Sequence, residues 1–366
     1  MISQEESQKL SKELKILDCP NMTDYEKCQY LIEHFKKTNE NYINIIKFRN
    51  EISDVRFLRY IKVPESLSSF FEYFNKLTTL IDLNNWNVSN VKNLNKLLRH
   101  CESLENLKGL EDWDISNVET MNQTFEDCHN LSTLSELSKW NTSNVKFMIE
   151  TFKNCMKLKN LNGLKNWNLS NCLNMDHMFY NCWSLVDISE LCNWDVSNVL
   201  YMDSIFEYDK SLSDISGISN WKCSPISLSR AFFNCNSLKD ISPLKEWNLE
   251  KTENTDEMFC CCDIKTLKPL SKWNVSNIKI MTSMFLENIH LISLEGLENW
   301  DVSNCKEFSK MFAFCPISDV SPLKNWKPNI ASNFSGMFSN SEIKDFSPLQ
   351  SWFPTLTLDE IKKKLT

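Results

Sequence analysis

Cysteine is the residue type whose number and spacing in this 366-residue chain best suit chemistry; there are fifteen, an odd number. Seven of them form what we call the cysteine series, with neighbours 27 or 53 residues apart: Cys101, Cys128, Cys155, Cys182, Cys235, Cys262 and Cys315. Thiols stacked on adjacent turns, about 4.8 Å apart, would be close enough to form disulfides. Identical side chains pointing one way are poor geometry for zinc, which needs a tetrahedron of ligands. We therefore interpret the series as small buried thiols that fill a core.

Cys260-Cys261-Cys262 departs from the one-cysteine pattern and leaves a redox or metal role as an alternative hypothesis. Other catalytic signatures are missing from the sequence. The five histidines share no catalytic spacing, and there is no H-E-x-x-H, no G-x-S-x-G and no phosphate-binding glycine loop. Acid–base catalysis needs two carboxylates in one cleft, whereas an internal repeat spreads the carboxylates along this chain. We predict that the protein is not an enzyme and has no cofactor and no metal site.

Tryptophan shows the period of that repeat. The tryptophans that recur every 26 or 27 residues are Trp86, Trp113, Trp140, Trp167, Trp194, Trp221, Trp247, Trp273, Trp300, Trp326 and Trp352. Only Trp183 falls outside this spacing. About twelve residues after each tryptophan from Trp113 to Trp326 comes a phenylalanine, and three residues later a member of the cysteine series or, as exceptions, Asp209, Asn288 or Ser341. This periodicity is typical of coils in which each turn, or rung, buries its apolar face against the next.

The stretch after each tryptophan predicts a short helix. A recurrent Ser-Asn pair can cap a helix start. Val118, Met121, Phe125 and Cys128 then follow at spacings of 3, 4 and 3, which places them on one helical face. A helix of about ten residues does not persist alone in water, so it must pack on another element.

The aliphatic stretch before each tryptophan, such as Leu104, Leu107 and Leu110, predicts a short strand. The fourth position before tryptophan holds glycine or proline in most units, which indicates a corner because proline cannot donate to a sheet ladder. The predicted fold class is an α/β solenoid. It is a right-handed coil of 26–27-residue rungs, each with a short parallel strand and a short helix.

The consensus W-[N/D]-x-S-N-V-x-x-M-x-x-M-F-x-x-C-x-S-L-x-x-L resembles the BspA-like leucine-rich repeats. It is most similar to the type first described in mycoplasma lipoprotein-associated surface proteins, which also occurs in protists and large DNA viruses. The resemblance covers residues from about 64 to Trp352. It implies a leucine-rich-repeat-like solenoid that binds proteins or host surfaces, usually without enzymatic activity.

The two ends of the chain depart from the repeat. Residues 1–63 show helix-compatible apolar spacing, which predicts a helical N-terminal cap for the first rung or, alternatively, a recruiting module. Residues 64–352 are predicted to form the solenoid, with about ten rungs. Residues 353–366, which end in DEIKKKLT, predict a C-terminal capping helix.

Charge and hydropathy indicate the cellular setting. The formal net charge of −8 argues against binding nucleic acid or an anionic membrane surface, since both need a basic face. The first twenty residues are polar, without the apolar run of a signal peptide, and no stretch of about 18 apolar residues could cross a membrane. We therefore expect an intracellular, cytoplasmic protein without membrane insertion.

Aromatic residues that depart from the consensus indicate a partner-binding patch. Phe147 and Tyr201 stand at the seventh position after their tryptophans, two rungs apart, with Asn174 between them. Tyr208 is seven residues after Tyr201, so both would project from one face of the predicted helix. Trp183 lies just after the helix of the intervening rung. Clustered exposed aromatics are typical of binding hot spots.

These observations favour a non-enzymatic scaffold for protein–protein interaction, with a protein as its partner. The first alternative is a secreted or surface-displayed adhesin. The second alternative is a cysteine-based redox or metal-binding protein, which would need bound metal or thiols of lowered pKa.

Overall fold

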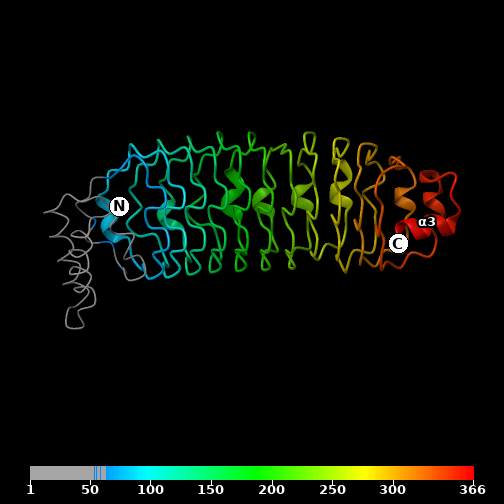
Figure 1. Ribbon diagram of the computed structural model, residues 1–366, viewed down its shortest axis with the longest axis horizontal. Helices are drawn as coiled ribbons and strands as arrows, with labels where there is room; N and C mark the ends of the chain where they lie inside the picture. The colour runs from blue at the N-terminus through cyan, green and yellow to red at the C-terminus, as the bar shows by residue number, and fades with distance from the viewer. Residues whose placement is uncertain (1–52, 54, 56–57, 59–62) are drawn as a thin grey trace, which may run out of the picture.

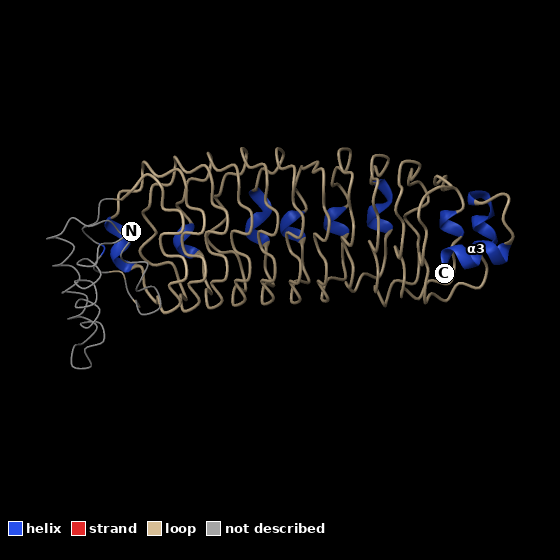
Figure 2. Cartoon of the chain, viewed as in Figure 1, coloured by secondary structure: helices blue, strands red, loops and turns tan. Residues whose placement is uncertain are grey.

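The computed structural model describes residues 53, 55, 58 and 63–366. They wind into one elongated coil whose turns stack side by side along its length (Figures 1 and 2). The predicted repeat solenoid is therefore confirmed. The predicted helical cap of residues 1–63 lies outside the described residues, apart from four single positions.

A stack of indoles runs through the core of the coil. Ring centroids of stacked neighbours lie 5.8–6.4 Å apart, and their planes differ by no more than 11°. Each indole N–H donates to a backbone carbonyl of the preceding rung, as Trp113 does to Leu83 and Trp140 to Leu110, both at 2.9 Å. A rung must therefore present the same ring and the same carbonyl as its neighbour, which explains why the sequence repeats.

The stretch after each tryptophan is not an α-helix, so that prediction is wrong. Val118 N–H donates to the Ile115 carbonyl at 2.9 Å, which closes a four-residue β-turn. Thr124 N–H closes another turn on the Met121 carbonyl at 3.3 Å. Met121 N–H donates instead to the Phe147 carbonyl of the next rung, at 2.9 Å. An α-helix uses its N–H groups for carbonyls four residues back, so a rung that gives alternate N–H groups to its neighbour cannot be one.

A parallel ladder in this same stretch joins the rungs. Single parallel bridges link, in order, Ser66, Asn93, Thr120, Phe147, Asn174, Tyr201, Ser227, Asn254, Ile280, Glu307 and Asn333. Two positions in each rung take positive φ, for example Gln123 at 59° and Asp127 at 60°. This conformation costs a residue with a Cβ about 1–2 kcal/mol, so the ladder hydrogen bonds must hold these residues in it.

The recurrent Ser-Asn pairs also serve the contact between rungs rather than a helix start. Asn117 Nδ2 donates to the Ser89 carbonyl at 2.7 Å. Asn144 Nδ2 donates in the same way to the Ser116 carbonyl at 2.6 Å. The asparagine amide therefore satisfies one backbone carbonyl of the preceding rung. Without the amide, that carbonyl would lack this hydrogen-bond partner.

The aliphatic stretch before tryptophan forms a 3₁₀ helix in eight described rungs, so the predicted strand there is wrong. These helices are η3 (Ile81–Asn85), η4 (Ser135–Leu137), η5 (Ser189–Asn193), η6 (Ser216–Ile218), η7 (Ser242–Leu244), η8 (Lys268–Lys272), η9 (Ser321–Leu323) and η10 (Ser347–Trp352). Proline stands at the start of η7, η8, η9 and η10. Its missing N–H costs nothing there, which explains the proline column. Within the described residues, no strand longer than a single bridge occurs (Figure 2).

Residues near the C-terminus cover the last rung. Helix α3 (Leu358–Leu365) starts with a capping box between Thr357 and Glu360 and buries Ile361 and Leu365. Phe338 N–H, which in other rungs would donate to the next rung, donates to the Leu365 carbonyl at 2.9 Å. Helix α3 thus occupies the place of a further rung at the right-hand end of the coil in Figure 1.

Candidate functional site

The parallel ladder presents one continuous surface along the coil. We call it the ladder face: the outward-facing side chains between the sixth and fourteenth residues after each tryptophan, such as residues 119–127. Its central section comprises the five rungs 146–154, 173–181, 200–208, 226–234 and 253–261. In the rung 226–234 the ladder starts one residue earlier after its tryptophan, since Ser227 pairs with Tyr201. Equivalent side chains on neighbouring rungs lie about 4.8 Å apart, as in any parallel pairing, so the face combines side chains that are distant in sequence.

Phe147 and Tyr201 lie in the bridged column of the central section. Asn174 pairs with both of them, so one rung separates the two rings. Each aromatic side chain is 39% exposed. The structure therefore brings these two members of the predicted patch onto one surface.

Tyr208 does not project beside Tyr201 from a helix, because no helix forms there. It is half-buried, has a φ of 65°, and packs edge-on against Tyr180 at 5.6 Å and Phe233 at 5.4 Å between ring centroids. Tyr208 thus belongs to a second aromatic cluster at the far edge of the ladder face. In a helix, seven residues make two turns, so the seventh residue returns to the same face. In this rung, the seven residues from Tyr201 to Tyr208 instead span the width of the ladder face.

Trp183 lies just past Cys182 and outside the ladder face as defined. Its side chain is 46% exposed. In the part of the chain that the structure describes, no ring contact joins it to Phe147, Tyr201 or Tyr208. The predicted patch is therefore two exposed rings, one half-buried ring at the edge, and a separate tryptophan.

The sequence reasoning missed Tyr180, Phe233 and the cations beside them. Arg230 lies over the Phe233 ring, 4.1 Å from its centroid, and Lys153 lies over Tyr180 at 5.4 Å. Both rings stand at the position where other rungs carry Glu126 or Lys153. Comparing that position across rungs, rather than spacing within one rung, would have found them.

The central section has more carboxylates than cationic side chains. Arg230 pairs with Glu207 at 2.7 Å and approaches Glu257 at 3.5 Å. Burial raises the pKa of Asp203, and Asp176 shows the same effect of burial on its pKa. Burial, together with the neighbouring carboxylate of Glu257, raises the pKa of Asp256 to about 6.

The cysteine series is built for packing. Cys128 Sγ donates to the Leu98 carbonyl and Cys155 Sγ to the Phe125 carbonyl, both at 3.2 Å. Burial raises the pKa of both thiols, which opposes formation of the reactive thiolate. Every cysteine among the described residues is a free thiol.

Cys260 and Cys261 are the exception in geometry as in sequence. Their sulfur atoms lie 3.5 Å apart, and Cys261 is partly exposed with its Sγ 3.5 Å from Glu287 Oε2. Over residues 63–366 and the three isolated described positions, no group of three or more His, Cys, Asp or Glu side chains could hold a metal ion.

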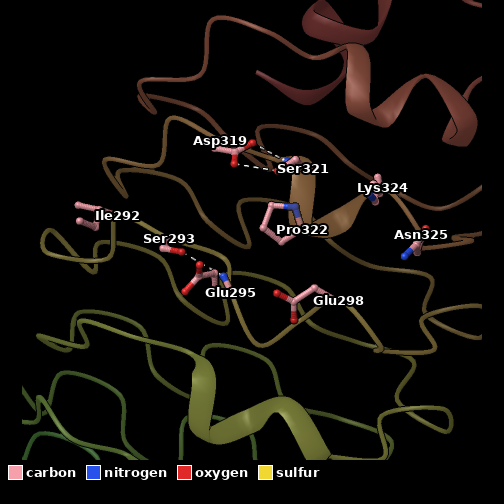
Figure 3. Close-up of a pocket in the computed structure, with 9 residues that line it drawn as sticks. All are labelled: Ile292, Ser293, Glu295, Glu298, Asp319, Ser321, Pro322, Lys324 and Asn325. Carbon is pink, nitrogen blue, oxygen red and sulfur yellow. Dashed lines mark hydrogen bonds between the residues drawn. The ribbon is translucent and has the colours of Figure 1, made fainter.

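A shallow pocket of about 340 Å³ lies near η9, between neighbouring rungs (Figure 3). Its carboxylates are occupied within the chain. Glu295 pairs with Lys268 at 2.6 Å, Glu298 accepts from the Gly296 N–H at 2.9 Å, and Asp319 accepts from the Ser321 N–H at 2.8 Å. We assign no ligand to this pocket, because its acidic groups already have partners.

One family model matches most of the chain. The family described as "Mycoplasma protein of unknown function, DUF285" matches residues 65–187, 184–265 and 261–358. Comparison with curated proteins gives no match. One similar solved structure is a leucine-rich cell surface protein from Faecalibacterium prausnitzii, with 14% identity over 72% of this chain and 79% of that chain and a TM-score of 0.27. Another is a leucine-rich repeat protein from Bacteroides ovatus, with 13% identity over 62% of this chain and 74% of that chain and a TM-score of 0.17.

None of the helices in the described residues is both long and apolar enough to cross a bilayer.

Proposed function

The chain belongs to the family described as "Mycoplasma protein of unknown function, DUF285", which confirms the resemblance to BspA-like repeats, and we propose that it is a non-enzymatic protein-interaction scaffold. The binding surface is the central section of the ladder face. The observation that carries the proposal is the pair of exposed rings, Phe147 and Tyr201, on one column of the ladder. The other bridged residues of this column are polar, apart from Ile280. Aromatic side chains dominate the energetics of protein interfaces.

The ladder beneath these rings supports the same proposal. Met148, directly after Phe147, is fully buried and donates its N–H to the Asn174 carbonyl at 3.0 Å. The backbone below the surface is thus held by hydrogen bonds on both sides. A preorganised surface loses little conformational entropy when a partner binds, which suits an extended, shallow interface.

The experiment is affinity capture with the whole chain, followed by binding of the identified partner as a purified protein. Phe147→Ala with Tyr201→Ala is expected to weaken binding at least tenfold, about 1.4 kcal/mol. The matched control is Ile289→Ala with Ile330→Ala, two side chains that are 62% and 58% exposed and lie outside the central section. Equal binding by both double variants would refute the ladder face as the binding surface.

We propose an intracellular location on separate grounds. Free thiols throughout the described residues are expected where glutathione keeps cysteines reduced. Four of the sequons in the sequence, at Asn87, Asn141, Asn168 and Asn274, provide the test, because export through a glycosylating pathway would add glycans to such sites. Protein from its native source should have the unmodified intact mass; glycan mass at any of the four would favour the adhesin alternative.

A further inference from the structure

The central section of the ladder face carries more negative charge than its own cations neutralise. Its carboxylates are Glu150, Asp176, Asp203, Glu207, Glu253, Asp256 and Glu257, and its cations are Lys146, Lys153 and Arg230. The formal charge of these five rungs is therefore −4, half of the net charge of the whole chain in less than a seventh of its length. This surface attracts positive charge.

All three cations already have carboxylate partners. Lys146 pairs with Glu119 of the preceding rung at 2.9 Å, and Lys153 pairs with Glu150. Arg230 pairs with Glu207 at 2.7 Å. No cation of this section is therefore left over for the aspartates.

Asp176, Asp203 and Asp256 form no ion pair with any described residue. Asp203 Oδ1 accepts the Ser229 N–H at 2.8 Å, which uses one of its two oxygens. The Asp256 carboxylate accepts no hydrogen bond from the described residues. Asp176 accepts hydrogen bonds on both oxygens, from Asn174 Nδ2 at 3.0 Å and from the Asp203 N–H at 2.7 Å, but these donors are neutral. The three side chains lie in one column of the ladder, so three carboxylates without a cationic partner line the same surface.

Aromatic rings stand next to this column and already accept cations. Arg230 over Phe233 and Lys153 over Tyr180 show that the spacing of the face suits a cation above a ring. Phe147 and Tyr201 have no such cation among the described residues and are exposed. An arginine from outside could stack on these rings and pair with a carboxylate at once, because its guanidinium is planar and bidentate.

Resting on the proposed function, we propose that the central section of the ladder face binds an arginine- or lysine-rich polypeptide segment that lies extended along the coil axis. Asp176, Asp203 and Asp256 pair with its cations, and Phe147 and Tyr201 stack on them. An extended chain repeats its side chains on one side every ~6.8 Å, and the rungs repeat every ~4.8 Å. Long, flexible arginine and lysine side chains bridge that mismatch, which short side chains could not.

The test uses the full chain and three synthetic peptides of about ten residues, which span ~33 Å when extended. They alternate serine with arginine, glutamine or glutamate. Affinities are measured by fluorescence anisotropy at an ionic strength of about 0.15 M, where long-range attraction is screened. The arginine peptide is expected to bind most tightly.

The decisive variant is Asp203→Asn with Asp256→Asn, which removes two charges and keeps the side-chain shape. Asparagine is already accommodated in this column, since Asn95 Oδ1 accepts the Asn122 N–H at 2.8 Å as Asp203 accepts that of Ser229. The matched control is Glu105→Gln with Glu342→Gln. These two exposed carboxylates lie outside the ladder face, and their loss changes the net charge equally.

Asp203→Asn with Asp256→Asn is expected to weaken binding of the arginine peptide about tenfold, and the control pair less than twofold. Equal affinity for all three peptides, or equal losses in both double variants, would overturn the proposal. If a purified protein partner still depends on Phe147 and Tyr201 in that case, only the cationic nature of the partner is wrong. If no partner depends on those rings, the proposed function itself is wrong.

Discussion

Replacing Asp209 with asparagine should stabilise the protein. Asp209 takes the place of a cysteine in the buried column, is fully inaccessible, and neither of its carboxylate oxygens has a hydrogen-bond partner. Asn288 shows what asparagine does in the equivalent place: its Nδ2 donates to the Phe259 carbonyl at 2.8 Å and to the Phe285 carbonyl at 3.0 Å. Asp209→Asn keeps the volume of the side chain, so no cavity is created.

The expected gain follows from these contacts. A buried polar group without a partner costs about 1–3 kcal/mol in proteins, and a restored hydrogen bond contributes about 1 kcal/mol net. We expect Asp209→Asn to raise the free energy of unfolding by about 2–3 kcal/mol at pH 7. This is a large fraction of the stability of a typical domain.

The gain should depend on pH in a defined direction. Burial raises the pKa of Asp209 in the folded protein, whereas an unfolded aspartate has a pKa of about 3.9. Below about pH 4 the group is protonated in both states and opposes folding least. As pH rises toward the folded-state pKa, the original protein loses up to about 1.4 kcal/mol per pH unit that the asparagine variant does not lose.

Urea unfolding followed by tryptophan fluorescence at pH 4 and pH 7 measures the difference. The reciprocal change, Asn288→Asp, keeps the oxygen that accepts the Ile264 N–H at 3.0 Å but replaces the amide that donates to the Phe259 and Phe285 carbonyls with a second carboxylate oxygen. It should destabilise the protein, and the loss should grow as pH rises. If the two Asp209 proteins have the same urea midpoint at pH 7, or if their difference does not grow between pH 4 and pH 7, Asp209 is not the unpartnered buried acid described above.

Three further outcomes are expected. Lys310→Gly should raise the free energy of unfolding by about 0.5–1 kcal/mol in a urea titration, because Lys310 has a φ of 57° and Gly336 already occupies the same position of the next rung. In native protein, mass mapping after a thiol reagent should find Cys261 labelled within minutes and Cys128 unlabelled until unfolding, since Cys261 is partly exposed and Cys128 is buried; similar rates for both would contradict the buried series. A carboxyl resonance that is absent from Asp256→Asn should titrate near pH 6 in NMR spectra, so Asp256 favours folding below about pH 4 and loses that contribution as pH rises through about 6; a midpoint near 4 would show that it is solvated.

The sequence predicted the period and the core of this fold because side-chain identity reports burial directly. Trp113, Phe125 and Cys128 are all buried where their columns require. It could not predict the local structure, since successive β-turns place inward residues three or four positions apart, and this spacing resembles a helical face. A helix and this turn structure differ in whether Met121 N–H donates within its own rung or to the Phe147 carbonyl of the next rung. The sequence of one rung does not determine which of these hydrogen bonds forms.

The candidate site was predicted only in part for a related reason. Phe147 and Tyr201 could be found because they interrupt one column of the alignment. Tyr208 was misplaced because its distance from Tyr201 was converted to space through a helix that does not form. The pairing of Arg230 with Phe233 depends on geometry across the ladder face, which sequence spacing alone does not encode.

The indole stack has a consequence for how the molecule handles light. Rings held 5.8–6.4 Å apart with nearly parallel planes couple their electronic transitions and pass excitation energy along the array. Emission from any one tryptophan therefore depends on its neighbours. A single quencher near one rung should reduce the fluorescence of several tryptophans. The near-ultraviolet circular dichroism of this chain is a property of the array, and it should collapse as soon as the register between rungs is lost.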